Sequence, residues 1–177
     1  EMANAILTTD DDVIICDPEG EYGNLVCQFK GEVIKVSSKS KDYLNPLDIN
    51  MNYGDGDAPL KDKANFIMSM LELVVGGSGL TAEEKSVIDR CLPKIYEKYF
   101  ENPKPCNMPI LQNLYDMLKN QEEKVGKKLA TEMEIYVTGS LNVFNHQSNV
   151  DLNKQLLCFD IKELGSQLKK IGMLVIQ

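Results

Sequence analysis

The chain has 177 residues and a formal net charge of −8, with 43% hydrophobic and 26% charged residues. This length and composition suit one domain of ordinary size, or one domain with a small lobe, and exclude wholesale disorder. The longest nearly apolar stretch, residues 66–75, contains Ser69 and Glu72. A membrane span needs about 20 apolar residues, so no transmembrane helix is expected, and the first residues do not predict a signal peptide.

The negative charge is confined to the first third of the sequence. Residues 1–60 hold twelve acidic residues and four lysines, whereas residues 61–177 hold fifteen acids and fifteen bases. Binding to nucleic acid by counterion release requires positive charge, so we expect no direct nucleic-acid binding by this segment. The five cysteines form no CxxC pair and are odd in number, which predicts free thiols in a reducing compartment.

Residues 1–58 have the pattern of an α/β core. Glu1–Leu7 reads as the middle of a helix with no capping residue at its start. Val13–Cys16 is a continuous apolar run, rich in β-branched residues and followed by Asp17-Pro18, which predicts a strand buried on both faces inside a parallel sheet. Glu21–Phe29 predicts a short helix, and Gly31–Val36 predicts a second strand.

Residues 59–138 have a helical pattern instead. Apolar residues at three- and four-residue steps predict a helix over Lys61–Val75. Thr81 and Glu84 form a capping box at the start of the next helix. Pro93 lies inside that helix and costs about 3 kcal/mol in regular geometry, so we expect a kink or a break there. Two more helices are expected over residues 110–120 and 122–136.

The α/β pattern returns over residues 139–177. After an irregular loop rich in asparagine, Gln155–Asp160 is an apolar run that ends in aspartate, and a helix is expected over Ile161–Ile171. An α/β sheet that resumes after a helical segment predicts one α/β domain with an all-helical insertion.

The leading candidate site is Asp17-Pro-Glu19-Gly-Glu21. It follows a predicted buried strand, and open α/β sheets bind ligands at the carboxyl ends of their strands. Its three carboxylates could orient water, hold Mg²⁺ or pair with a lysine. The alternative is a solvated turn shaped by Pro18 and Gly20, and the residues alone leave both interpretations open.

Other candidates have plainer explanations. Asp10–Asp12 precede the strand instead of following it, so a solvated turn is expected. His146 has no partner at metal-ligand spacing, and Arg90, the only arginine, is expected in a surface ion pair. The glycine-rich segment 76–79 lacks the lysine and the preceding strand of a phosphate-binding loop.

Three strings in order then point to a family. Residues 13–22 (VIICDPEGEY), 31–34 (GEVI) and 44–49 (LNPLDI) resemble the motor domain of VirB/TraC-type ATPases of conjugative type IV secretion systems from Gram-positive conjugative elements. Residues 139–145 (GSLNVFN) and 158–164 (CFDIKEL) are similar to the same family in the same order. The resemblance covers nearly the whole chain.

The resemblance implies an internal fragment of a P-loop (RecA-like) motor, with a mostly parallel sheet and an inserted helical subdomain. The Walker A loop is then expected before Glu1 and the Walker B strand after Gln177, so the fragment alone should not hydrolyse ATP. It implies ATP and Mg²⁺ for the parent protein, with neither bound to the fragment. The resemblance implies that Glu21 and Glu19 are catalytic and that Asp17, Asn45 and Pro46 bind the cofactor. Asn142, Phe144 and Asp160 are expected to be structural.

The family further implies ring assembly with other subunits, contact with a secretion channel and coupling proteins, and a cytoplasmic position peripheral to the inner face of the cell membrane. The alternative hypothesis is a non-catalytic protein-interaction module, in which the helical lobe docks a partner and the α/β part supports it. The expected division of the chain is 1–58, 59–138 and 139–177.

Overall fold

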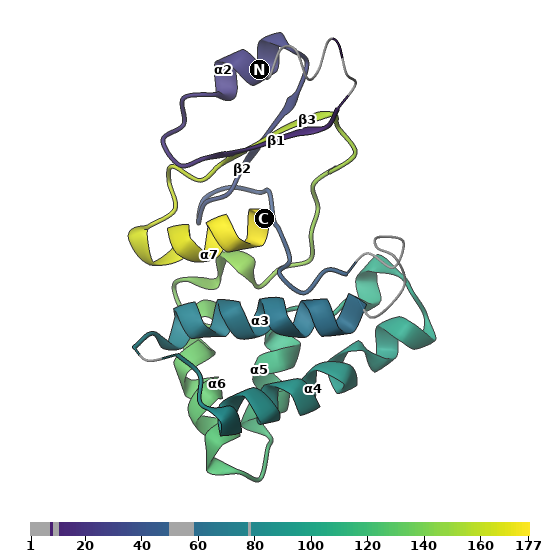
Figure 1. Ribbon diagram of the computed structural model, residues 1–177, viewed down its shortest axis with the longest axis vertical. Coiled ribbons are helices and arrows are strands. Elements are labelled where there is room, and N and C mark those ends of the chain that lie inside the picture. The colour runs from purple at the N-terminus through teal and green to yellow at the C-terminus, as the bar shows by residue number, and fades with distance from the viewer. Residues whose placement is uncertain (1–7, 9–10, 50–58, 78) are drawn as a thin grey trace. The chain divides into compact units, whose positions relative to one another are not determined.

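The computed structural model describes residues 8, 11–49, 59–77 and 79–177. The helix expected over residues 1–7 lies outside these ranges. The chain divides into two compact units, one made of the described residues up to Leu44 together with Ser148–Gln177, the other of those in Asn45–Gln147 (Figure 1). We call them the sheet unit and the helical unit. The three-part domain division expected from the sequence stays a prediction.

The sheet unit contains three strands in one parallel sheet. They are β1 (Val13–Asp17), β2 (Glu32–Lys35) and β3 (Leu156–Asp160), in the order β1-β3-β2. Val13 pairs with Leu156 and Asp17 with Asp160, while Glu32 pairs with Leu157. The predicted α/β class with a parallel sheet is therefore confirmed, and residues 143 positions apart in the sequence pair on adjacent strands.

The central strand of the described sheet is β3, not β1. Leu156 to Phe159 are each at most 4% exposed, whereas Ile14 of β1 is 60% exposed. The prediction that Val13–Cys16 is buried on both faces is therefore wrong for the described part of the chain. β1 pairs there with β3 alone, and an apolar run does not by itself distinguish a central strand from an edge strand.

Two helices flank the strands on opposite sides (Figure 1): α2 (Gly23–Gln28) and α7 (Ser166–Ile176). Val26 of α2 packs against Leu156 and Cys158. Helix α7 begins five residues later than expected, because residues 161–165 form a turn in which Leu164 N donates to Ile161 O at 3.1 Å. Ile161 and Leu164 are buried in that turn. Their apolar side chains therefore indicate packing in the core, and they do not belong to a helix.

The helical unit contains the helices that the sequence predicts between β2 and β3. Its helices are α3 (Pro59–Val75), α4 (Ala82–Glu101), α5 (Leu111–Lys119) and α6 (Lys124–Val137), with short 3₁₀ turns at Pro105–Asn107 and Asn142–Phe144. Helix α4 continues through Pro93, so the chain does not break there. Cys91, Leu92, Ile95 and Tyr96 on either side of the proline are buried, and this packing sustains the helix across the lost backbone bond.

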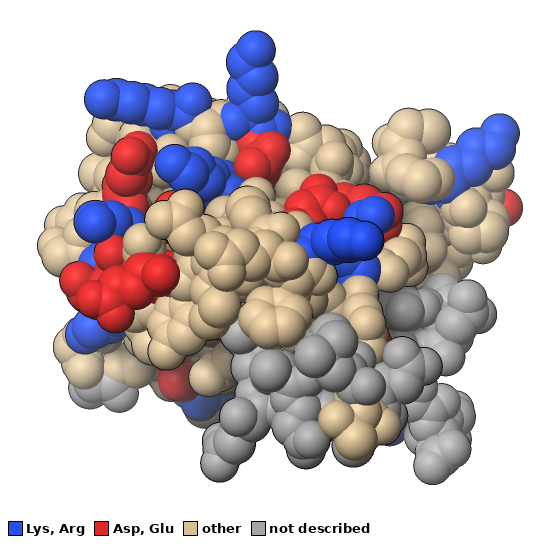
Figure 2. Space-filling model, turned by 90° about the horizontal axis from the view of Figure 1, so that it is seen from above, with Lys and Arg blue, Asp and Glu red and all other residues tan. Residues whose placement is uncertain are grey.

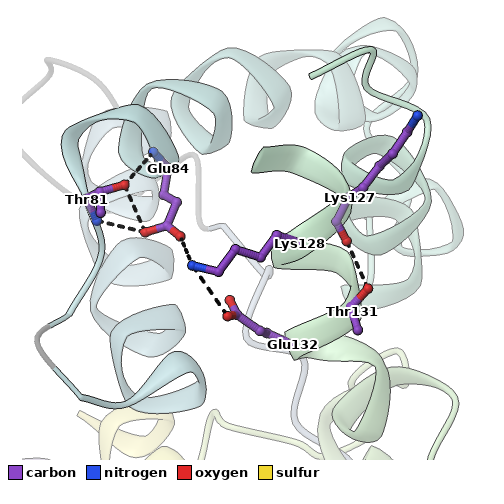
Figure 3. A network of polar contacts seen from close by, with 6 residues as sticks. All are labelled: Thr81, Glu84, Lys127, Lys128, Thr131 and Glu132. Atoms are coloured by element: carbon purple, nitrogen blue, oxygen red, sulfur yellow. Dashed lines mark hydrogen bonds and ion pairs between the residues drawn. The ribbon is translucent and has the colours of Figure 1, made fainter. Parts of the chain in front are cut away.

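The predicted capping box at the start of α4 is confirmed and extends to α6 (Figure 3). Glu84 Oε2 accepts from Thr81 N at 2.8 Å, and Glu84 N donates to Thr81 Oγ1 at 3.2 Å. The other carboxylate oxygen of Glu84 accepts from Lys128 Nζ at 2.9 Å. Glu84 is 3% exposed; the backbone bond from Thr81, together with Lys128, holds its pKa below the usual range.

Candidate functional site

The loop between β1 and α2 is organised around the carboxylate of Asp17. Asp17 is 1% exposed, and its side chain accepts from the backbone N–H groups of Gly20 (2.8 Å), Glu21 (3.2 Å) and Tyr22 (2.9 Å). Burial favours the neutral form of Asp17, but these backbone bonds outweigh it and keep the pKa lowered. Asp17 is thus a buried anion whose oxygens are already used by the loop.

The carboxyl end of β3 packs against this loop. Ile161 N donates to Asp17 O at 3.0 Å, and Lys162 N donates to the Asp160 side chain at 3.0 Å. Gly20 adopts φ +71°, and a Cβ there would lie 2.8 Å from Lys162 Cδ. Glycine is required at this position because the backbone is left-handed and the side chain of Lys162 crosses close to it.

Glu19 and Glu21 point outward from the same loop. Both are exposed. Lys169 of α7 donates to Pro18 O at 3.0 Å and lies 4.0 Å from Glu19 Oε1. The Glu21 carboxylate forms no ion pair with a described residue, so among these three acids it is the one most available to a water or a cation.

Asn45 and Pro46 belong to the helical unit, and the structure describes them only within it. Asn45 is buried; its Nδ2 donates to Asp48 Oδ1 at 2.8 Å and to Pro109 O at 2.9 Å, and its Oδ1 accepts from Leu47 N. Pro46 O accepts from Lys63 Nζ at 3.0 Å. These contacts give Asn45 a structural role in the turn before α3.

Several residues at the sheet edge were missed by sequence reasoning. Lys169, Lys162 and Cys158 all approach the Asp17 loop, although they lie more than 140 positions away in the sequence. Nothing in the sequence around these residues indicates that they lie near the Asp17 loop. Only the parallel pairing of β1 with β3 brings them to the loop.

The described residues were compared with the requirements of a metal site, a charged binding surface and a membrane-spanning helix. No group of three or more His, Cys, Asp or Glu residues that could hold a metal ion occurs among them. On the face drawn in Figure 2, acidic and basic side chains are interspersed around an uncharged area. Of the helices in the described ranges, none combines the length and the apolar character needed to cross a membrane.

The fold resembles a solved structure closely. VirB4 of Thermoanaerobacter pseudethanolicus superposes with a TM-score of 0.80 at 18% sequence identity, and the match covers 99% of this chain and 71% of that chain. At this identity the likeness defines the fold: the chain has the architecture of a large part of VirB4. No family model matches the sequence, and no curated protein matches it.

Proposed function

We propose that this chain is an internal segment of the motor domain of a VirB/TraC-type ATPase that powers conjugative type IV secretion in a Gram-positive element. The observation that carries the proposal is the VirB4 fold match over 99% of the chain. The resemblance of the strings at 13–22, 31–34, 44–49, 139–145 and 158–164 to this family supports the proposal at the level of sequence.

In this proposal the two exposed acids of the β1–α2 loop work beside the nucleotide. Asp17 holds the loop, and the exposed Glu21, with Glu19 next to it, would orient a water or the hydration shell of Mg²⁺ when the nucleotide is bound. Mg²⁺ on ATP supplies charge neutralisation of the phosphates when bound. Carboxylates disfavour a bare polyphosphate, so their contribution depends on that cation and on the rest of the motor.

The proposal extends to assembly and location. The parent protein would form a ring with other copies, contact a secretion channel and coupling proteins, and sit at the cytoplasmic face of the membrane.

The gene that encodes the chain provides the first test. We expect a GxxxxGK[ST] motif just before the codon for Glu1 and an apolar strand ending in Asp-Glu just after that for Gln177. Calorimetry of the 177-residue chain with Mg-ATP should then detect no binding, because the phosphate loop is supplied from outside. Absence of both motifs, or tight binding of Mg-ATP by the chain, would contradict the proposal.

A second candidate function is an interaction module in which the helical unit binds a partner. It is favoured by one specific observation, an open cavity in the helical unit whose wall includes two exposed lysines, Lys94 and Lys98. The two functions are compatible, since an inserted lobe of a motor can carry its contacts.

A further inference from the structure

The β1–α2 loop is held in place from two sides of the sheet unit. Three of its backbone N–H groups donate to the Asp17 carboxylate, which belongs to the loop itself. Two consecutive backbone carbonyls at its start accept from the segment after β3 instead. Asp17 O accepts from Ile161 N at 3.0 Å, and Pro18 O accepts from Lys169 Nζ at 3.0 Å. The loop is therefore fixed both by its own aspartate and by the turn and helix that follow β3.

Lys169 donates to Pro18 from a rigid base. It lies in the first turns of α7, where its backbone N–H donates to Gly165 O at 3.0 Å. Leu168 and Ile171, on either side of it in the sequence, are each 3% exposed. The side chain of Lys169 is 31% exposed, whereas its neighbour Lys170 is an exposed residue. The ammonium group of Lys169 is thus directed at the loop by a helix whose own position is set by the core.

The bond to Pro18 O controls how the chain leaves β1. The proline ring fixes φ of Pro18 at about −65°, so rotation about ψ is the main freedom that remains before Glu19. A charged donor on the Pro18 carbonyl restricts that rotation, and such a bond is stronger than one between neutral groups. Gly20 then turns the chain with φ +71° toward Glu21. The direction of both acids therefore depends on the peptide that Lys169 holds.

The same ammonium group has only a weak direct effect on the acids. Lys169 Nζ lies 4.0 Å from Glu19 Oε1, and the Glu19 side chain is 73% exposed. An exposed ion pair at this distance contributes little, because water and salt screen it. The bond to Pro18 O is thus the principal contact of Lys169, and the influence of this lysine on the acids passes through the backbone.

We propose that Lys169 is a positioning residue of the candidate site: through Pro18 O it fixes the direction in which Glu19 and Glu21 leave the β1–α2 loop. The importance of this direction for ATP hydrolysis rests on the proposed function, whereas the positioning itself does not. The plainer interpretation is a lysine whose apolar stem covers part of the sheet unit. The two interpretations differ in what a methionine at this position would do, since methionine keeps an apolar stem and lacks the ammonium group.

The first experiment measures amide hydrogen exchange in the 177-residue chain by NMR. In Lys169→Met we expect the amides of Gly20, Glu21 and Tyr22 to exchange about threefold to tenfold faster, because their loop has lost one of its two attachments. The amides of β3 should exchange as in the parent chain. Lys169→Arg retains a charged donor and should restore the protection of the loop. Lys170→Met is the matched control, and its loop amides should exchange as in the parent chain.

The second experiment measures steady-state ATP hydrolysis by the full-length protein. We expect Lys169→Met to lower kcat about threefold to tenfold and to leave KM for ATP unchanged, because the loop acids are proposed to act on water and not to bind the nucleotide. Lys169→Arg should return kcat to within about twofold of the parent value, and Lys170→Met should have the parent kcat.

The two experiments fail in different ways. Equal exchange of the loop amides in Lys169→Met and Lys170→Met, faster exchange throughout β3 as well, or no restoration by Lys169→Arg would each overturn the positioning role. Faster loop exchange with an unchanged kcat in Lys169→Met would overturn its link to hydrolysis. A parent protein without ATPase activity would contradict the proposed function instead, and the exchange measurement, which uses no nucleotide, would still decide whether Lys169 positions the loop.

Discussion

The thiol of Cys158 lies 3.9 Å from Asp17 Oδ2, across the parallel pair of β3 and β1. Cys158 is fully buried. Burial first, and then the negative charge of Asp17, raise the pKa of Cys158 to about 12. The sheet therefore places a protonated, inert thiol under the loop that carries the candidate site, where it can only donate to the Asp17 carboxylate.

Thiol alkylation should consequently separate the exposed cysteines from the buried ones. With iodoacetamide at pH 8, we expect Cys27 and Cys106, which are exposed, to be modified within minutes, and Cys158 and Cys91, which are buried, to stay unmodified. Peptide mass spectrometry measures this site by site. All five should react in guanidinium chloride; rapid modification of Cys158 in the native chain would show that the β1–β3 pairing is not closed.

Replacing Asp17 should destabilise the sheet unit. Asp17→Ala removes the acceptor of three backbone N–H groups, and we expect a loss of about 2–3 kcal/mol in the free energy of unfolding. Glu19→Gln is the control: its side chain is 73% exposed and its contact with Lys169 is 4.0 Å long, so the change should stay within about 0.5 kcal/mol. Urea unfolding of both variants measures the difference, and equal stability would refute the role given to Asp17.

Acid should weaken the fold through the two buried carboxylates. Asp17 and Glu84 both have a pKa lowered in the folded chain from ordinary values of 3.8 and 4.5. The unfolded state then binds more protons as pH falls, so their stabilisation is complete above those values and is lost below them. We expect the urea midpoint to drop between pH 5 and pH 3, and to drop less in Glu84→Gln, which is already weaker at pH 7. An identical pH dependence of the parent chain and Glu84→Gln would contradict this account.

The approach of α2 to β3 can be tested at one glycine. A Cβ at Gly31 would lie 2.6 Å from Leu156 Cγ and 2.7 Å from Val26 Cγ1. Gly31→Ala should therefore cost about 1–3 kcal/mol by overpacking. Gly23→Ala, where a Cβ meets nothing within 4 Å, should be neutral or slightly stabilising. Thermal unfolding of the pair gives the comparison, and equal melting temperatures would place the helix farther from the sheet.

The sequence predicted where helices and strands form better than it predicted how deeply they are buried or which distant residues they contact. The Thr81–Glu84 box and the apolar runs at 13–16 and 155–160 each rest on chemistry within a few residues, and all three correspond to observed elements. The burial of β1 was not predictable, because it depends on how many strands flank it. The contact of Lys169 with the Asp17 loop was not predictable either, because it spans 151 positions. In the same way, the sequence predicts that Asn45 lies in a turn, but its hydrogen bond to Pro109 O depends on how the helical unit packs and was not predictable.

ATP hydrolysis by the full-length gene product is the most direct test of the proposed motor function. Glu21→Gln keeps the size of the side chain and removes its charge; we expect kcat to fall at least about tenfold while ATP binding is retained. Glu163→Gln, an exposed acid on the turn after β3, should leave kcat unchanged. A kcat of the Glu21→Gln variant equal to that of the parent protein and of Glu163→Gln would contradict the assignment of this loop to the nucleotide site, and a full-length protein that neither binds nor hydrolyses ATP would contradict the motor function itself.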